Sequence, residues 1–246
     1  MASFADRGAA ALRPARERLA GWRFDRALGV RTSARDAAAL ARDAGRYEPA
    51  APDRLRRAAA ALRLGPSDTV LDIGSGLGRA VFAFARRGRP GAAIGFEMDP
   101  GLHAGAVANL SAARSRLRCP DIRLFCTDAA RTPVPAEVTA VYLYNPAEGP
   151  EMDEVFARIR ESLDRRPREM RIAYEYPVHG FGLVRLGFRR TAPAEALHLY
   201  TWPGAPAPAH APGALGAALP RRTGPGGAPP ALPSPAGPAV TPGPAP

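Results

Sequence analysis

The 246-residue sequence contains no lysine, only two cysteines and few aromatic residues, which make up 7% of the chain. All 34 basic residues are arginine, and their excess over 23 acidic residues gives a formal net charge of +11. The arginines are scattered, often at positions typical of amphipathic helices, so we interpret most of them as solvated residues that stand in for lysine. A basic surface that binds nucleic acid is the alternative that this charge leaves open.

The scarcity of cysteine and of long apolar runs excludes several classes of protein. Cys119 and Cys126 are too few for a disulfide framework or a four-ligand metal site, and they suit a reducing compartment. No apolar run approaches the roughly 18 residues that a membrane span requires. The first 24 residues carry charges throughout and lack the apolar core of a secretory signal. We therefore expect a cytoplasmic protein with no membrane partner and no metal site.

The composition predicts three parts. Residues 203–246 hold half of the 28 prolines, together with many glycines and alanines. Such a segment cannot bury enough apolar surface to offset the entropy lost on ordering, so we expect a disordered Pro/Ala/Gly-rich tail. The pattern of residues 1–46 predicts a helical extension, with one helix over 12–22 and a second over 34–45 that ends at Gly45. Residues 47–202 remain as the main domain.

Strand and helix patterns alternate along the main domain. This order and the short apolar strands predict an α/β fold, a Rossmann-like doubly wound, mostly parallel seven-stranded sheet with a C-terminal antiparallel hairpin. The expected helices cover 53–64, 78–87, 100–114 and 151–164. The expected strands cover 69–73, 92–97, 122–126, 138–144 and 170–176, followed by a hairpin of 188–191 and 197–202.

The stretch VLDIGSGLGR places a glycine-rich loop directly after the first expected strand. Gly74, Gly76 and Gly78 leave the backbone bare where ligands bind in doubly wound sheets. A dinucleotide site would need a glycine at the position of Arg79, so a bound pyrophosphate is disfavoured. Asp72, just before the loop, can instead pair with an ammonium group. Together these features favour S-adenosylmethionine as the ligand.

Acidic residues also follow the next two expected strands. In GFEMDP, the carboxylate of Glu97 can accept both ribose hydroxyl groups. In FCTDAA, Asp128 can bind the adenine amino group while Ala129 offers its backbone N–H. Taken singly, Asp128 could simply cap a turn and 97–100 could simply begin a helix. Their order and spacing together favour one nucleoside ligand.

These motifs resemble those of class I, seven-stranded S-adenosylmethionine-dependent methyltransferases, and the resemblance covers residues 47–202. It is greater still to a bacterial group with Tyr-Glu-Pro, here 47–49, a leading segment like WRFDRALGVRTS, and Tyr-Asn-Pro, here 144–146. The resemblance would then extend back to about Trp22. It implies a cofactor site made of Asp72, Gly74, Ser75, Gly76, Gly78, Arg79, Glu97, Met98, Asp128, Ala129 and Asn145.

The stretch YLYNPAE, at the end of the fourth expected strand, bears on the methyl acceptor. Amino-methylating members of the class carry Asn-Pro-Pro-Tyr or Asp-Pro-Pro-Tyr there, whereas here Ala147 and Glu148 follow Asn145-Pro146. The aromatic ring that would stack on a flipped base is missing, which counts against DNA adenine methylation.

We therefore expect a methyltransferase acting on a nitrogen of a protein side chain or small molecule. Asn145, Pro146 and Tyr47 are its candidate catalytic residues, although Asn145 could only cap the turn and Tyr47 could only pack the N-terminal helices. The cofactor carries the activated leaving group, so alignment matters more than a strong base. A non-catalytic S-adenosylmethionine-binding protein and a nucleic-acid methyltransferase are the alternatives.

Overall fold

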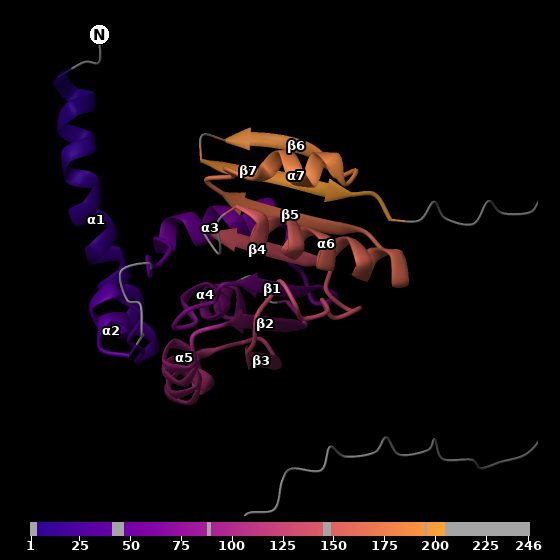
Figure 1. Ribbon diagram of the computed structural model, residues 1–246. Helices are drawn as coiled ribbons and strands as arrows, with labels where there is room; N and C mark the ends of the chain where they lie inside the picture. Colours follow the sequence, from indigo (N-terminus) through magenta and orange to yellow (C-terminus); the bar gives the residue numbers. More distant parts are fainter. Residues whose placement is uncertain (1–3, 41–46, 88–89, 145–148, 195, 205–246) are drawn as a thin grey trace, which may run out of the picture. The chain divides into compact units, whose positions relative to one another are not determined.

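The computed structural model describes residues 4–40, 47–87, 90–144, 149–194 and 196–204 (Figure 1). The tail expected from residue 203 lies, beyond Gly204, outside the described residues. The helices are α1 Phe4–Leu28, α2 Ala34–Ala38, α3 Pro52–Ala61, α4 Arg79–Arg87, α5 Pro100–Ala113, the 3₁₀ turn η2 Arg114–Arg116, α6 Pro150–Arg165 and α7 Gly180–Arg185. The strands are β1 Thr69–Ile73, β2 Ala92–Glu97, β3 Asp121–Cys126, β4 Ala140–Tyr144, β5 Met170–Glu175, β6 Arg189–Ala194 and β7 Leu197–Trp202.

The strands form one seven-stranded sheet in the order β3-β2-β1-β4-β5-β7-β6. Strands β1 to β5 pair in parallel, and β7 runs antiparallel to both β5 and β6. The fold predicted from the sequence, a mostly parallel Rossmann-like sheet with a C-terminal antiparallel hairpin, is confirmed.

Helices cover both faces of the sheet, and each strand divides its side chains between them. Val70 and Tyr142 point to one face, where they join the core built by α3 and α4. Leu71 and Val141 point to the other face, which α6 and α7 cover. Because both faces are buried, the central strands are mostly apolar, which is why they stand out in the sequence and why Asp72 in β1 is an exception.

The winding of the sheet reverses between β1 and β4. From β1 the chain proceeds to β2 and β3 on one side, and from β4 to β5 on the other. The carboxyl ends of β1, β2, β4 and β5 therefore lie together at this reversal, and sheets of this kind bind ligands in the crevice beside it.

The N-terminal region differs from its prediction. One helix, α1, continues through Pro14, and α2 ends after five residues instead of reaching Gly45. Beyond α2 the carbonyl of Leu40 lies so close to Gly101 of α5 that a Cβ there would overlap it. Leu28, the last residue of α1, and Val30 are buried in the core that also contains Val70 of β1.

Helix α7, between β5 and β6, was not predicted, because its sequence GFGLVR is short and contains two glycines. In the part of the chain that the structure describes, no helix combines the length and apolar character needed to cross a membrane.

Candidate functional site

The glycine-rich loop connects β1 to α4 and adopts a conformation that favours glycine. Gly74, Gly76 and Gly78 have φ values of 77°, 53° and 87°, in the left-handed region. The N–H groups of Gly74 and Ser75 both donate to the carbonyl of Phe96, each at 2.9 Å. The loop is therefore anchored to the end of β2, with its alternate residues lacking any side chain.

Glu97, the last residue of β2, is held directly against this loop. Its Oε2 accepts the N–H of Gly76 at 2.7 Å, and its Oε1 accepts the N–H of Asp99 at 2.8 Å. Each oxygen keeps a second lone pair, so the fixed carboxylate can still accept two hydroxyl groups. Met98, which follows it, is 67% exposed.

The simpler explanation of this segment, a helix start, holds for Asp99. Asp99 is the N-cap of α5, and its side chain accepts the N–H of Leu102 at 2.9 Å. A helix start does not account for Glu97, whose carboxylate accepts a hydrogen bond from the glycine loop.

Asp72 lies within β1 and is buried, with 4% of its surface exposed. Burial, aided by the nearby charge of Glu97, raises the pKa of Asp72 to about 8. A carboxyl group with this pKa is mainly protonated at neutral pH. A cation placed beside it would lower the pKa and let it ionise.

Asp128 follows β3, one strand further from the crevice. Its Oδ1 accepts the N–H of Ala130 at 2.9 Å, and its Oδ2 lies 3.4 Å from the Nε of Arg131. The turn-capping role considered for Asp128 is therefore present. The N–H of Thr127 bonds to the carbonyl of Glu97 at 2.7 Å, which ties this turn to the end of β2. Ala129 is half-buried within the turn.

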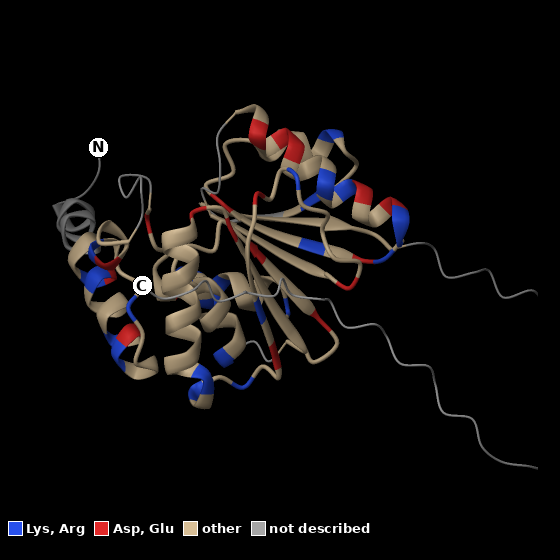
Figure 2. Cartoon of the chain, turned by 60° about the horizontal axis from the view of Figure 1, so that its bottom comes forward, with Lys and Arg blue, Asp and Glu red and all other residues tan. Residues whose placement is uncertain are grey.

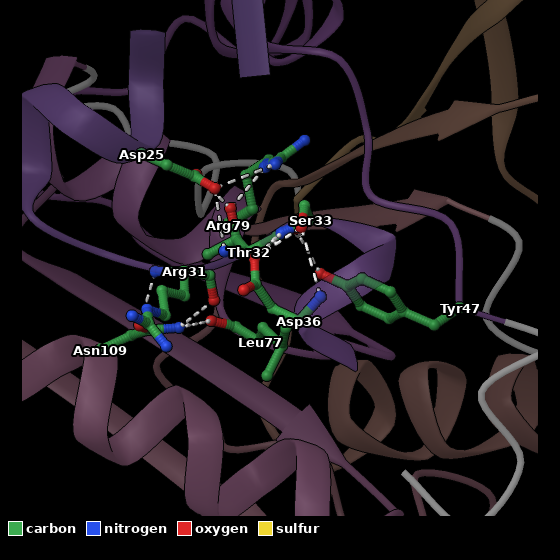
Figure 3. Close-up of polar contacts among 9 residues, drawn as sticks. All are labelled: Asp25, Arg31, Thr32, Ser33, Asp36, Tyr47, Leu77, Arg79 and Asn109. Atoms are coloured by element: carbon green, nitrogen blue, oxygen red, sulfur yellow. Dashed lines mark hydrogen bonds and ion pairs between the residues drawn. The ribbon is translucent and has the colours of Figure 1, made fainter. Parts of the chain in front are cut away.

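Arg79, which follows the loop, is oriented differently from the other predicted cofactor residues. Its guanidinium is buried and donates to Thr32 Oγ1 at 2.6 Å, with Nη2 at 3.5 Å from Asp25 Oδ2 (Figure 3). The side chain thus binds the N-terminal segment, and the contribution of Arg79 to the loop comes from its backbone, where α4 begins.

The N-terminal segment 31–33 lies along the glycine loop (Figure 3). Asn109 of α5 joins the two: its Nδ2 donates to the carbonyl oxygens of Arg31 at 2.8 Å and Leu77 at 3.1 Å. The Tyr47 hydroxyl donates to the carbonyl of Thr32 at 3.1 Å, and its ring packs on Gly76 so closely that a Cβ there would overlap it. Burial raises the pKa of Tyr47, so its hydroxyl stays neutral. Tyr47 therefore closes one side of the loop.

A second group of polar residues lies at the ends of β4 and β5, across the crevice from the loop. Tyr144 forms a hydrogen bond with Glu48, and this bond together with burial raises the pKa of Tyr144. Tyr142 OH and Glu175 Oε1 are buried without a partner among the described residues. Asn145 and Pro146, the other candidate catalytic residues, lie outside the described residues.

Arg54 of α3 organises this second group. Its guanidinium lies 3.7 Å from Glu175 and 3.4 Å from Glu17, and it stacks 4.8 Å from the centre of the Tyr176 ring. Burial raises the pKa of Glu175 and Arg54 opposes this effect. The sequence analysis missed Glu175, although it follows the same rule as Asp72 and Glu97, an acid near the carboxyl end of a parallel strand.

No family model matches the chain, and no curated protein matches it either. Solved structures do. An RNA methyltransferase from Salinibacter ruber, bound to S-adenosyl-L-homocysteine, is 22% identical at a TM-score of 0.47, over 63% of this chain and 92% of that one. An S-adenosylmethionine-dependent O-methyltransferase from Thermotoga maritima is 14% identical at 0.48, over 67% and 69%.

A TehB-like S-adenosylmethionine-dependent methyltransferase from Corynebacterium glutamicum is 14% identical at a TM-score of 0.46, over 78% of this chain and all of that one. At these identities the likeness concerns the fold, and membership in the bacterial group stays a prediction. By its own strand order and pairing, the chain has the seven-stranded Rossmann-like fold that the sequence resemblance to class I methyltransferases implied.

Proposed function

We propose that the crevice beside the glycine loop binds S-adenosylmethionine and that the protein is a methyltransferase. The observation that carries this proposal is the placement of Asp72 and Glu97 around Gly76. Asp72 is buried with no cation paired to it among the described residues, and Glu97 is fixed by two backbone N–H groups. A nucleoside with a charged amino-acid end would offer an ammonium group to Asp72 and ribose hydroxyl groups to Glu97.

The residues fit this cofactor group by group. Asp72 would pair with its ammonium group, which would offset the unfavourable burial of an unpaired carboxylate. Glu97 would accept the ribose hydroxyls through its remaining lone pairs. Three residues of the loop, Gly74, Gly76 and Gly78, have no side chain, so its backbone is open to a ligand where the Tyr47 ring does not cover it. Asp128 and the backbone of Ala129 would contact the adenine, although Asp128 also caps its own turn.

When bound, the cofactor supplies an activated methyl group on sulfur. The chain has to align an acceptor and exclude water, and no strong base is required. The end of β4 and β5 offers Tyr144, Glu48 and Glu175 for this purpose. Carboxylates and tyrosine hydroxyls suit an amine, so a nitrogen of a protein side chain or small molecule is the acceptor we propose.

Calorimetry with S-adenosylmethionine and its product tests the binding site. We expect one site per chain, and we expect Asp72→Asn to weaken binding at least about tenfold, the cost of one lost charge-assisted contact. Asp121→Asn serves as the control, because Asp121 is an exposed carboxyl at the start of the edge strand β3. Equal affinity in the wild type and Asp72→Asn would refute the assigned site.

Transfer of a labelled methyl group tests the enzymatic part of the proposal. We expect label to pass from S-adenosylmethionine to a protein or small-molecule fraction of a host extract, and not with Asp72→Asn. Binding without transfer to any fraction would support a non-catalytic S-adenosylmethionine-binding protein instead.

A further inference from the structure

A groove of about 1440 Å³ lies between α1, α3 and α4, on the face of the sheet that α3 and α4 cover. Eight arginines line it, and Asp53 is the only carboxylate among the described lining residues. For the whole chain the ratio is 34 basic to 23 acidic residues. The absence of lysine explains why these cations are arginines, but it does not explain why so many of them surround one groove with a single acid.

Charge is otherwise mixed along the chain. In Figure 2, basic and acidic positions both occur on the helices and near the ends of strands. The lining of the groove differs from this mixture, since it contains eight arginines and one carboxylate. Its arginines come from separate elements, Arg16 and Arg23 from α1, Arg56 from α3, and Arg86 and Arg87 from α4. Arg63, Arg116 and Arg118 complete the set.

The acidic residues of α1 nearest the groove do not line it. Glu17 and Asp25 pair with Arg54 at 3.4 Å and Arg79 at 3.5 Å. Arg16 and Arg23 lie on the side that lines the groove, seven positions apart and so on one helical face. The carboxylates of this part of α1 are thus bound to arginines outside the groove lining.

Most of the lining arginines are exposed, and their charges are not neutralised by described carboxylates. Arg56 pairs with Asp53 at 3.1 Å, and both side chains are exposed, so this pair contributes little. Arg116 donates to the carbonyl oxygens of Leu28 and Ala112, which leaves its charge in place. Arg63, Arg86 and Arg87 lie at or beyond helix C-termini, where a cation favours the helix dipole, but the dipole does not account for Arg16, Arg23 or Arg118.

The floor of the groove is apolar and includes Leu19, Phe24 and Leu55. The groove exceeds the roughly 300–1,000 Å³ typical of small-molecule pockets. Repeated cations along an open groove suit a polymer with regularly spaced anions. We propose that this groove binds the phosphodiester backbone of a nucleic acid, without reading its sequence.

This surface is separate from the cofactor crevice. Arg86 and Arg87 lie in the last turn of α4, whose first residue follows the glycine loop. At about 1.5 Å per residue, the helix places roughly 12 Å between those two ends. The groove is therefore distinct from the proposed cofactor site. The proposal that it binds nucleic acid does not depend on the proposed methyltransferase function.

Fluorescence anisotropy with labelled 30-nucleotide RNA and with duplex DNA of the same length tests the proposal in the absence of any cofactor. We expect binding at 50 mM salt whose affinity falls steeply with added salt. Arg23→Glu/Arg118→Glu should weaken it at least about tenfold and reduce the salt slope by about 2. Tighter binding of RNA or of DNA in this assay identifies which of the two nucleic acids the groove prefers.

The matched control is Arg185→Glu/Arg189→Glu, which changes the net charge equally at exposed positions outside the groove. We expect it to alter the affinity less than about threefold, and Asp72→Asn to leave it unchanged. Equal losses in both double variants would overturn the proposal, as would no binding at 50 mM salt. Binding to vesicles with 30% phosphatidylserine that nucleic acid does not compete away would overturn it in favour of a membrane surface.

Discussion

The guanidinium of Arg79 lies 3.5 Å from the carboxylate of Asp25, although 54 positions separate them in the sequence. Arg79 directly follows the glycine loop and Asp25 belongs to α1, so this pair joins the N-terminal helix to the start of α4. Thr32 lies between them, donating to Asp25 and accepting from Arg79. The three side chains form one buried network (Figure 3).

Arg79→Ala should destabilise the fold by about 3 kcal/mol, because it leaves the largely buried carboxylate of Asp25 without its cation. Urea unfolding followed by circular dichroism measures the change. The control is Arg131→Ala, since Arg131 pairs with Asp128 at the surface and is 86% exposed; there we expect less than about 0.5 kcal/mol. Similar values for the two variants would mean that the Arg79 network does not hold the N-terminal segment.

The Arg79 network also shows where the sequence was sufficient and where it was not. The central strands were predictable because burial on both faces makes them short apolar runs, and β1, β2 and the loop glycines follow directly from that pattern. The placement of Asp72 and Glu97 beside the loop was predictable, because parallel strands bring their carboxyl ends to one edge, and their role in binding a cofactor stays a prediction. The pairing of Arg79 with Asp25 could not be predicted, because it depends on how α1 packs against the start of α4. No local sequence pattern encodes this packing. The same holds for Arg54 and Glu175, from α3 and β5.

Gly76→Ala should weaken cofactor binding at least about tenfold. The position has a φ of 53°, and an added Cβ would overlap the Tyr47 ring. Gly149→Ala is the comparison, because Gly149 also has a positive φ, 58°, with nothing within 4 Å of an added Cβ. It therefore carries backbone strain without a clash, and it lies outside the glycine loop. Both are compared by urea unfolding and calorimetry.

Tyr47→Ala in the Gly76→Ala background makes the steric explanation testable. Removing the ring should recover part of the stability that Gly76→Ala alone loses, since the overlap disappears while the strain remains. If the two losses simply add, Tyr47 does not pack on the loop as the structure shows.

Glu175→Gln should separate acceptor chemistry from cofactor binding. Glu175 is the last residue of β5 and does not belong to the glycine loop. It lies beside Arg54, and its Oε1 has no partner among the described residues. We expect methyl transfer to fall at least about tenfold while the dissociation constant for the cofactor changes less than about threefold. A loss of cofactor affinity matching the loss of transfer would instead place Glu175 in the cofactor site.

The raised pKa of Asp72 predicts how cofactor binding depends on pH. With a pKa of about 8, the free site holds a proton at pH 7, and pairing with an ammonium group should release it. Calorimetry in two buffers of different ionisation enthalpy should show close to one proton released per cofactor at pH 7. Affinity should rise as the pH increases from 6 to 8 and fall again where the ligand's ammonium group loses its proton. Asp72→Asn should show weaker binding without proton release.

The same pKa determines a stability effect that needs no ligand. A carboxyl whose pKa is higher in the folded state than its unfolded value near 4 binds more protons when folded. The free energy of unfolding contributed by Asp72 therefore falls as the pH rises from about 4 to about 8. Asp72→Asn removes this loss, so the variant should melt higher than the wild type at pH 9, with the difference vanishing towards pH 4. A lower melting temperature for the variant at pH 9 would mean that Asp72 is ionised and stabilised by a partner, and the cofactor's ammonium group would then have no role in compensating its burial.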